Sequence, residues 1–299
     1  MDVSIIIVNY NTSDMVLDCI GSIRKESKET PYEIIVVDNN SEEGQKSKLR
    51  GHDNFTLIEL TENIGFGRAN NIGAKKATGK VLFLLNPDTL LANDAVSILY
   101  RYMSERPDVG ICGGNLYDRE MNPTHSFHML HPSILYEVDF ALNQVFRRIR
   151  YGKNIQFNHS DKPIDVAIIT GADLMISKEV WEKVEGFSPD YFMYYEDAEL
   201  CYQVKKLGYR IVSVPESKII HLEGGSFTET EKHCRRILEG RFTFFKKHYS
   251  RFYNISADTC NIVSLVIAIL ICKLVKRQEK EYNYKIRLNT YIKYLRGKL

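Results

Sequence analysis

Short apolar runs alternate with longer amphipathic segments over the first hundred residues of the chain. The apolar runs are rich in β-branched side chains and predict strands buried on both faces at 3–8, 33–37, 55–60 and 81–85. The segments between them predict helices at 14–26 and 67–77 and a third that ends at Met103, with Ser13 and either Asn93 or Asp94 as N-caps. This βαβα order predicts an α/β fold with a mostly parallel sheet and helices on both faces.

The pattern becomes less regular after residue 105. Strands are predicted at 109–113, 166–169, 174–176 and 209–214, and helices at 178–184, 197–207 and within 229–248. Gly208 is placed to end the second of these helices as a C-cap. Residues 117–165 are rich in aromatic residues and histidine and give no assignable element. Three histidines recur there every three residues, but the flanking Pro123 and Pro132 favour a loop over a metal-binding helix face.

Polar side chains follow three of the predicted buried strands at the point where each strand ends. The first ends in Asn9-Tyr10-Asn11, the second in Asp38-Asn39-Asn40 and the fourth in Asn86-Pro87-Asp88. Because open α/β sheets bind ligands at the carboxyl ends of their strands, these side chains are expected to converge on one crevice.

The composition is that of a globular protein. The chain has 299 residues, 44% of them hydrophobic, and a formal net charge of +2. These values suit one large domain, alone or with a smaller appendage, and do not indicate a nucleic-acid binder. The six cysteines form no CxxC pair and no metal-ligand spacing, so we interpret them as free thiols of a reducing cytosol. The N-terminus lacks the basic region of a signal peptide, and none is expected.

Positive charge is concentrated at the C-terminal end. Residues 273–299 carry nine Lys or Arg and two acidic residues, directly after the apolar stretch Ile262–Cys272. That stretch is about half of the ~20 residues that a membrane-spanning helix needs. A helix lying in the membrane interface, with anionic lipid beside the basic tail, is therefore favoured over a span, and a buried C-terminal helix is the alternative.

Three single residues suit a site for a nucleotide and a divalent cation. Asp88 lies on a turn after a buried strand and can offer an oxygen ligand to a hard cation, although Asn-Pro-Asp is also ordinary turn chemistry. Asp38 can accept a hydrogen bond from a base or a ribose hydroxyl, or else cap the turn that follows it. His221 can complete a divalent site as a neutral imidazole, although a single histidine is more often structural.

Two further segments carry candidate chemistry. Asn63–Asn71 contains two glycines that permit close approach of the backbone, and Arg68, which can reach a phosphate. Its glycine spacing is not that of the dinucleotide-binding motif, and a loop leading into a helix is the alternative. Glu196 and Asp197 begin a predicted helix, where they are either a general base with an acceptor-binding partner or simple N-terminal charges that the helix dipole favours.

Taken together, five motifs resemble family 2 glycosyltransferases, and most closely their bacterial rhamnosyltransferase-like branch. They occur in the order seen in that family: Val8-Asn9-Tyr10-Asn11, Val36-Val37-Asp38-Asn39-Asn40-Ser41, Asn63-x-Gly65-Phe66-Gly67-x-Ala69-Asn70-Asn71-x-Gly73, Leu85-Asn86-Pro87-Asp88 and Glu196-Asp197-x-Glu199-Leu200-Cys201. The resemblance covers about residues 3–250. It implies a GT-A fold and an inverting transfer of sugar from a nucleoside-diphosphate sugar to a hydroxyl.

The resemblance also implies roles for individual residues. Asp88 and His221 would hold Mg²⁺ or Mn²⁺ against the diphosphate. Asp197 would deprotonate the acceptor hydroxyl, and Glu196 would contact the acceptor or orient the base. The residues expected to bind the donor are Asn9, Asn11, Asp38, Asn63, Arg68, Asn70 and Asp88.

The chain departs from the family pattern in two places. Only Asp88 is acidic at the metal turn, where many relatives have two acidic residues, so the metal is expected to depend on His221, water and the diphosphate. The Gln-x-x-Arg-Trp motif of processive synthases is absent. The corresponding residues are Lys232-His233-Cys234-Arg235-Arg236, which implies transfer of a single sugar.

Three regions are predicted: a nucleotide-sugar-binding half at 1–115, an acceptor-binding and catalytic half at 116–250, and membrane-associating helices at 251–299. dTDP-rhamnose is the favoured donor and a UDP-sugar the next. A glycan or lipid-linked glycan at the cytoplasmic face of the plasma membrane is the expected acceptor.

Two other functions remain as alternatives. A nucleotidyltransferase usually has a Gly-rich, Arg-containing loop after its first strand, where this chain has Asn9-Tyr10-Asn11-Thr12. A non-catalytic nucleotide-sugar-binding protein would not need both Asp88 and Asp197.

Overall fold

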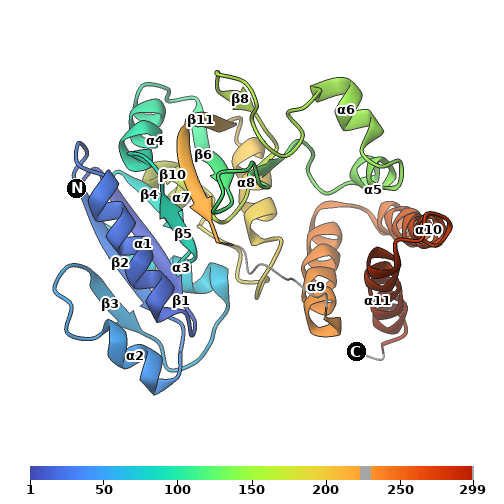
Figure 1. The fold of residues 1–299 in the computed structure, drawn as a ribbon, viewed down its shortest axis with the longest axis horizontal. Helices are drawn as coiled ribbons and strands as arrows, with labels where there is room; N and C mark the ends of the chain where they lie inside the picture. The colour runs from blue at the N-terminus through green and yellow to red at the C-terminus, as the bar shows by residue number, and fades with distance from the viewer. Residues whose placement is uncertain (223–229, 298–299) are drawn as a thin grey trace. The chain divides into compact units, whose positions relative to one another are not determined.

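The computed structural model describes residues 1–222 and 230–297 and contains two compact units (Figure 1). Among these residues, the first unit, called here the sheet unit, comprises 1–129, 153–192 and 196–222. The second, called the helical unit, comprises 130–152, 193–195 and 230–297. The two units are defined by packing and not by function, so the three predicted functional regions stay predictions.

The sheet unit is built on a nine-stranded sheet with the order β3-β2-β1-β4-β10-β6-β11-β5, in which β8 also pairs with β11. Its strands are β1 (Val3–Asn9), β2 (Tyr32–Asp38), β3 (Thr56–Glu59), β4 (Val81–Leu85), β5 (Thr89–Leu91), β6 (Val109–Tyr117), β8 (Ile164–Asp165), β10 (Asp173–Ser177) and β11 (Arg210–His221). Strands β1 to β4 run parallel, as do β6 and β11, whereas β10, β5 and β8 are antiparallel to their neighbours. The predicted α/β class with a mostly parallel sheet is confirmed. A second, two-stranded sheet joins β7 (Phe127–His128) to β9 (Ile168–Ile169).

Helices cover both faces of the large sheet. They are α1 (Ser13–Glu26), α2 (Glu43–Leu49), α3 (Phe66–Lys76), α4 (Ala95–Ser104), α7 (Lys178–Lys183) and α8 (Glu196–Lys206). Ile5 and Ile7 of β1 belong to the same buried cluster as residues of α1 and α4. Ile6 points to the other face, toward α3, where a Cβ on Gly73 would lie 2.6 Å from Ile6 Cγ2. Only glycine lets α3 approach the sheet so closely.

Local signals succeeded at some helix ends and failed at others. Asp94 caps α4 as predicted, because its side chain accepts a hydrogen bond from Ser97 N. The prediction for Ser13 is wrong, since α1 begins at Ser13 itself and the Ser13 hydroxyl donates to the Gln45 carbonyl. Residues 117–165, which gave no pattern, contain α5 (Ile134–Ala141) and α6 (Val145–Tyr151).

The helical unit contains α5, α6, α9 (Glu231–His248), α10 (Arg251–Leu274) and α11 (Gln278–Leu295). Helix α10 packs against α5 and α11. It has 24 residues and is long and apolar enough to cross a membrane, a test of length and composition that the core helix of a soluble protein also passes. The predicted apolar stretch, Ile262–Cys272, is about half as long as α10. The helix is longer because it also includes the preceding, mostly uncharged residues.

Candidate active site

The ends of β1 and β2 are joined through Asn9 and Asp38, which face each other in the parallel register. Asn9 Nδ2 donates to Asp38 Oδ2 at 2.7 Å, and Ser41 N donates to Asp38 Oδ1 at 2.9 Å. Both residues are fully buried. Asn11, at φ +60°, turns the chain after β1 and accepts from Glu42 N at 2.8 Å. Asn9, Asn11 and Asp38 therefore connect the ends of β1 and β2 through hydrogen bonds. Their contact with a donor stays a prediction.

The loop before α3 is tied to the end of β2 by Asn39. Its amide donates to Asn63 Oδ1 at 3.0 Å and accepts from Ile64 N at 2.9 Å. Gly65 has φ +90°, and a Cβ there would overlap the Phe192 carbonyl oxygen, which accepts from Phe66 N at 3.0 Å. Gly65, one of the two glycines predicted to permit close approach of the backbone, is thus in close contact with the backbone of Phe192.

Two predicted donor-binding residues of α3 have partners within the protein. The Arg68 guanidinium donates to the Pro189 carbonyl, with its Nε at 2.9 Å. Asn70 is buried, and its amide donates to the Phe66 carbonyl at 3.1 Å. Arg68 is exposed and would have to leave the Pro189 carbonyl in order to reach a phosphate. Donor binding by either residue stays a prediction.

The Asn86-Pro87-Asp88 turn links β4 to β5. Its geometry is fixed by Thr89, whose hydroxyl donates to the Asn86 carbonyl at 2.7 Å. Thr89 pairs with His221 across β5 and β11, and Leu222 N donates to the Asp88 carbonyl at 2.7 Å. These backbone bonds bring Asp88 Oδ1 to 3.4 Å from His221 Nε2.

The donor set of this pair fits part of a divalent site. Two adjacent ligands of one ion, each about 2.1 Å from it, lie roughly 3 Å apart, and the observed 3.4 Å is close to this. The Asp88 side chain keeps 28% of its surface exposed, so it is open to solvent. Within residues 1–222 and 230–297 no group of three or more His, Cys, Asp or Glu could hold a metal. Water and donor oxygens can supply further ligands of a bound ion.

Glu196 and Asp197 form the first turn of α8. Gly171 N donates to Asp197 Oδ2 at 3.2 Å, and Ala198 N donates to Asp197 Oδ1 at 2.7 Å. The next residue after Gly171, Ala172, accepts from Asn86 N at 3.0 Å. The dipeptide Gly171-Ala172 therefore holds both Asp197 and the turn that carries Asp88.

The two acidic residues differ in their surroundings. Glu196 is buried, and burial, with a smaller effect of the neighbouring Asp197 charge, raises its pKa. Among the described residues its Oε2 has no hydrogen-bond partner. Burial also raises the pKa of Asp197, against the opposing effect of its backbone N–H donors. A carboxylate with a raised pKa is a stronger base, which suits proton abstraction from a hydroxyl.

Asn39, Gly171, Ala172 and Phe192 are contributors that sequence reasoning did not single out. Asn39 occurs in one of the motifs, and Gly171-Ala172 lies between the strands predicted at 166–169 and 174–176. No local signal marks Phe192. Its role rests on its backbone carbonyl, which accepts a hydrogen bond from Phe66 N, 126 residues earlier in the chain.

Known proteins with similar sequences or folds were found by comparison. A model of the family described as glycosyl transferase family 2 matches residues 4–184. The chain is 26% identical over 296 residues to the low-salt glycan biosynthesis hexosyltransferase Agl10 of Haloferax volcanii, covering 94% of this chain and 87% of that protein. It is 26% identical over 223 residues to the dTDP-rhamnosyl transferase RfbF of Shigella flexneri, covering 73% and 68%.

A solved structure shares the fold. The mannosyltransferase PcManGT from Pyrobaculum calidifontis, in complex with GDP-Man and Mn²⁺, superposes with a TM-score of 0.65 at 17% identity, covering 99% of this chain and 88% of that one. This likeness confirms the predicted GT-A type of fold.

Proposed function

The chain belongs to glycosyl transferase family 2 and is a glycosyltransferase, and from this premise we propose that it moves one sugar, with inversion, from a nucleoside-diphosphate sugar to a hydroxyl of a glycan precursor. The resemblance to the rhamnosyltransferase-like branch of the family is confirmed by relatives such as RfbF. The observation that carries the proposal is the joint attachment of Asp197 and the Asp88 turn to Gly171-Ala172.

In the proposed reaction, Asp88 and His221 hold a divalent cation, Mg²⁺ or Mn²⁺. When bound, this ion neutralises the charge that develops on the leaving diphosphate. Asp88 supplies a hard carboxylate oxygen and His221 an imidazole nitrogen from the adjacent strand end. Because residues 1–222 and 230–297 supply only two such ligands at this place, the site is proposed to favour the ion together with the donor over the ion alone.

Asp197 is the proposed general base. Its carboxylate takes the proton of the acceptor hydroxyl as that oxygen attacks the anomeric carbon from the side opposite the diphosphate. The hydrogen bonds from Gly171 N and Ala198 N fix the direction in which the carboxylate points. Glu196, buried and with a raised pKa, is proposed to orient the base or the acceptor in its protonated form.

Rhamnose is the proposed sugar, carried as dTDP-rhamnose, with a UDP-sugar as the second candidate. The name of RfbF supports this choice, whereas the mannosyltransferase with GDP-Man shares only the fold. The acceptor is proposed to be a glycan or a lipid-linked glycan.

A peripheral position on the cytoplasmic face of the plasma membrane is proposed from the surface of α10. Six apolar side chains recur on it at helical spacing and are between 40% and 82% exposed: Val263, Val266, Ile267, Leu270, Ile271 and Leu274. They form one stripe along the helix, and the basic α11 follows in the chain. An apolar stripe on a helix that is followed in the chain by basic residues suits the interface of an anionic membrane.

A donor screen tests the proposed function. Purified full-length protein is incubated with Mn²⁺ or Mg²⁺ and with dTDP-rhamnose, UDP-glucose or GDP-mannose, and release of the nucleoside diphosphate is measured with and without lipid-linked glycan acceptors. Release stimulated by acceptor, highest with dTDP-rhamnose, is expected. Binding of a donor without any release would favour the non-catalytic alternative, and release of pyrophosphate from a nucleoside triphosphate would favour a nucleotidyltransferase.

A further inference from the structure

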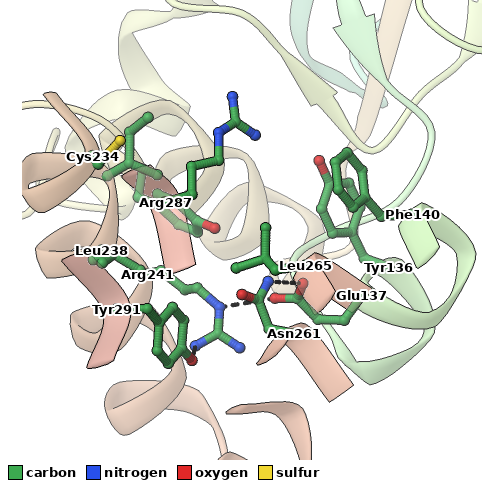
Figure 2. Close-up of a pocket in the computed structure, with 12 residues that line it drawn as sticks. Tyr136, Glu137, Phe140, Cys234, Leu238, Arg241, Asn261, Leu265, Arg287 and Tyr291 are labelled. Carbon is green, nitrogen blue, oxygen red and sulfur yellow. Dashed lines mark hydrogen bonds and ion pairs between the residues drawn. The ribbon is translucent and has the colours of Figure 1, made fainter. Parts of the chain in front are cut away.

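The helical unit contains a pocket that the proposed chemistry does not use (Figure 2). It encloses a cavity of about 150 Å³ between α5, α9, α10 and α11 and is partly open to solvent. Most of the wall is apolar or aromatic: Tyr136, Phe140, Tyr195, Ile237, Leu238 and Leu265.

One end of the pocket is cationic. Arg241 and Arg287 line it together with a single acidic residue, Glu137. Arg241 is 3% exposed, and its Nε donates to Glu137 Oε1 at 2.8 Å. Asn261 Nδ2 donates to the other carboxylate oxygen of Glu137 at 2.5 Å, so the acidic residue is already neutralised and bonded. Arg287, an exposed residue, adds a second guanidinium to this end of the pocket.

One nitrogen of the Arg241 guanidinium, Nη2, differs from the other two in its hydrogen bonding. Its Nη1 donates to Asp258 Oδ1 at 2.6 Å and to the Tyr291 hydroxyl at 2.9 Å. Its Nη2 is buried and, among the described residues, has no hydrogen-bond partner. A buried guanidinium N–H without an acceptor is costly, and an anionic oxygen in the pocket would supply the missing acceptor.

An apolar wall with two arginines at one end selects an amphiphilic anion. Arginine is well suited to phosphate because its planar fork matches phosphate oxygens. Tyr195, which lines the pocket, directly precedes Glu196 in the chain.

We propose that this pocket binds the phosphate or diphosphate ester of a lipid alcohol, with the phosphate at Arg241 Nη2 and Arg287 and the hydrocarbon chain along Phe140, Leu238 and Leu265. This inference deepens the proposed function, on which it rests, by making the lipid-linked acceptor a phosphorylated lipid. The same chemistry is present in the headgroups of membrane phospholipids, so the experiment separates the two sources.

Binding is measured with the full-length protein by isothermal titration calorimetry in the absence of donor. The probes are farnesyl diphosphate, inorganic diphosphate and farnesol, each kept below its critical micelle concentration. Farnesyl diphosphate is expected to bind at least about tenfold more tightly than either part alone, since both ends contribute. Equal binding of farnesyl diphosphate and farnesol would overturn the proposal. If phosphatidylglycerol vesicles abolish the farnesyl diphosphate signal, the pocket takes bulk lipid and the acceptor assignment fails.

Two variants place the ligand in the pocket. Arg287→Gln removes an exposed cation from its rim, and Leu265→Trp fills its apolar part. Each is expected to weaken farnesyl diphosphate binding by about tenfold or more, the effect of one charge-assisted hydrogen bond or of lost apolar contact. Arg235→Gln is the matched control, since this arginine is on α9, pairs with Glu239 and does not line the pocket. Thermal unfolding checks that each variant is folded.

Unchanged binding in both pocket variants would overturn the proposal. The proposed transferase activity and the proposed lipid-phosphate pocket can be tested separately. If the wild-type protein releases nucleotide in the donor screen but does not bind farnesyl diphosphate, the proposed function stands and the pocket assignment is wrong. If it binds farnesyl diphosphate but transfers no sugar, the pocket binds the lipid phosphate and the proposed function is wrong.

Discussion

Asp88 Oδ1 lies 3.4 Å from His221 Nε2, although the two residues are 133 positions apart in the chain. The antiparallel pairing of Thr89 with His221 and the hydrogen bond from Leu222 N to the Asp88 carbonyl hold them together. Backbone pairing on both sides leaves little freedom for either side chain to move away. A carboxylate and an imidazole held in this way are suited to share one cation.

Replacing either partner should therefore change the metal requirement. Asp88→Asn is expected to lower nucleotide release by about a hundredfold or more, because a carboxylate ligand of the ion is lost. His221→Gln is expected to raise the Mn²⁺ concentration needed for half-maximal release, by about tenfold to hundredfold. Titration of Mn²⁺ against release measures both effects. Asp53→Asn, at an exposed position, is the control, and metal curves that coincide with the wild type would contradict the assignment.

The sequence predicts the sheet well because its signals are local. Apolar β-branched runs mark β1, β2 and β4, and the Asp94 side chain marks the start of α4. The pairing of Asp88 with His221 is different. Each residue is recognisable in its motif, but no local pattern specifies that β5 pairs with β11, and β5 itself has only three residues.

Elements without a clear period were missed for physical reasons. Helix α5 is apolar or aromatic around most of its circumference, which hides the helical period, and Pro123 and Pro132 suggested a loop. The hydrogen bonds of Gly171-Ala172 to Asp197 and Asn86 depend on backbone groups, which carry no side-chain signature.

The raised pKa of Glu196 should make folding depend on pH. The folded chain keeps a proton on this carboxyl at pH values where the unfolded chain has released it. The stability that this group contributes therefore falls as pH rises from the ordinary carboxyl pKa toward the raised one. Glu196→Gln cannot lose this proton, so the free energy of unfolding should decline less between about pH 5 and pH 8, by about 1.4 kcal/mol for each unit of raised pKa.

Urea denaturation at several pH values measures this effect. Glu216→Gln, at an exposed position, should behave as the wild type. If Glu196→Gln shows the same pH slope as the wild type, the buried protonated state of Glu196 is refuted.

Gly65 should be intolerant of any side chain. Its φ is +90°, and a Cβ would overlap the Phe192 carbonyl oxygen that Phe66 N needs. Gly65→Ala is expected to cost about 1–3 kcal/mol of stability through strain, and more where the loop shifts. Gly44→Ala, in α2 with open space around it, should be neutral or slightly stabilising. Thermal unfolding of both variants checks the prediction, which fails if they behave alike.

The exposed stripe on α10 should bind anionic membrane. Replacing Val266 and Leu270 by Gln removes two of its apolar side chains, which are 42% and 55% exposed. Binding to phosphatidylglycerol vesicles in a flotation assay is expected to weaken by about tenfold or more. Full burial of one apolar side chain contributes about 1.5–3 kcal/mol, and each of these two has about half of its surface left to bury. Met15→Gln, on the exposed side of α1, should bind as the wild type. Vesicle binding that survives the double substitution would assign the stripe to another partner.

Acceptor-dependent release of nucleoside diphosphate by Asp197→Asn tests the central claim most directly. The substituted side chain can still accept from Gly171 N, so the fold and the donor dissociation constant should be retained. Loss of the base is expected to lower release about 100- to 10,000-fold, the range in which general-base catalysis contributes. Release at the wild-type rate, with donor and acceptor both saturating, would contradict the account.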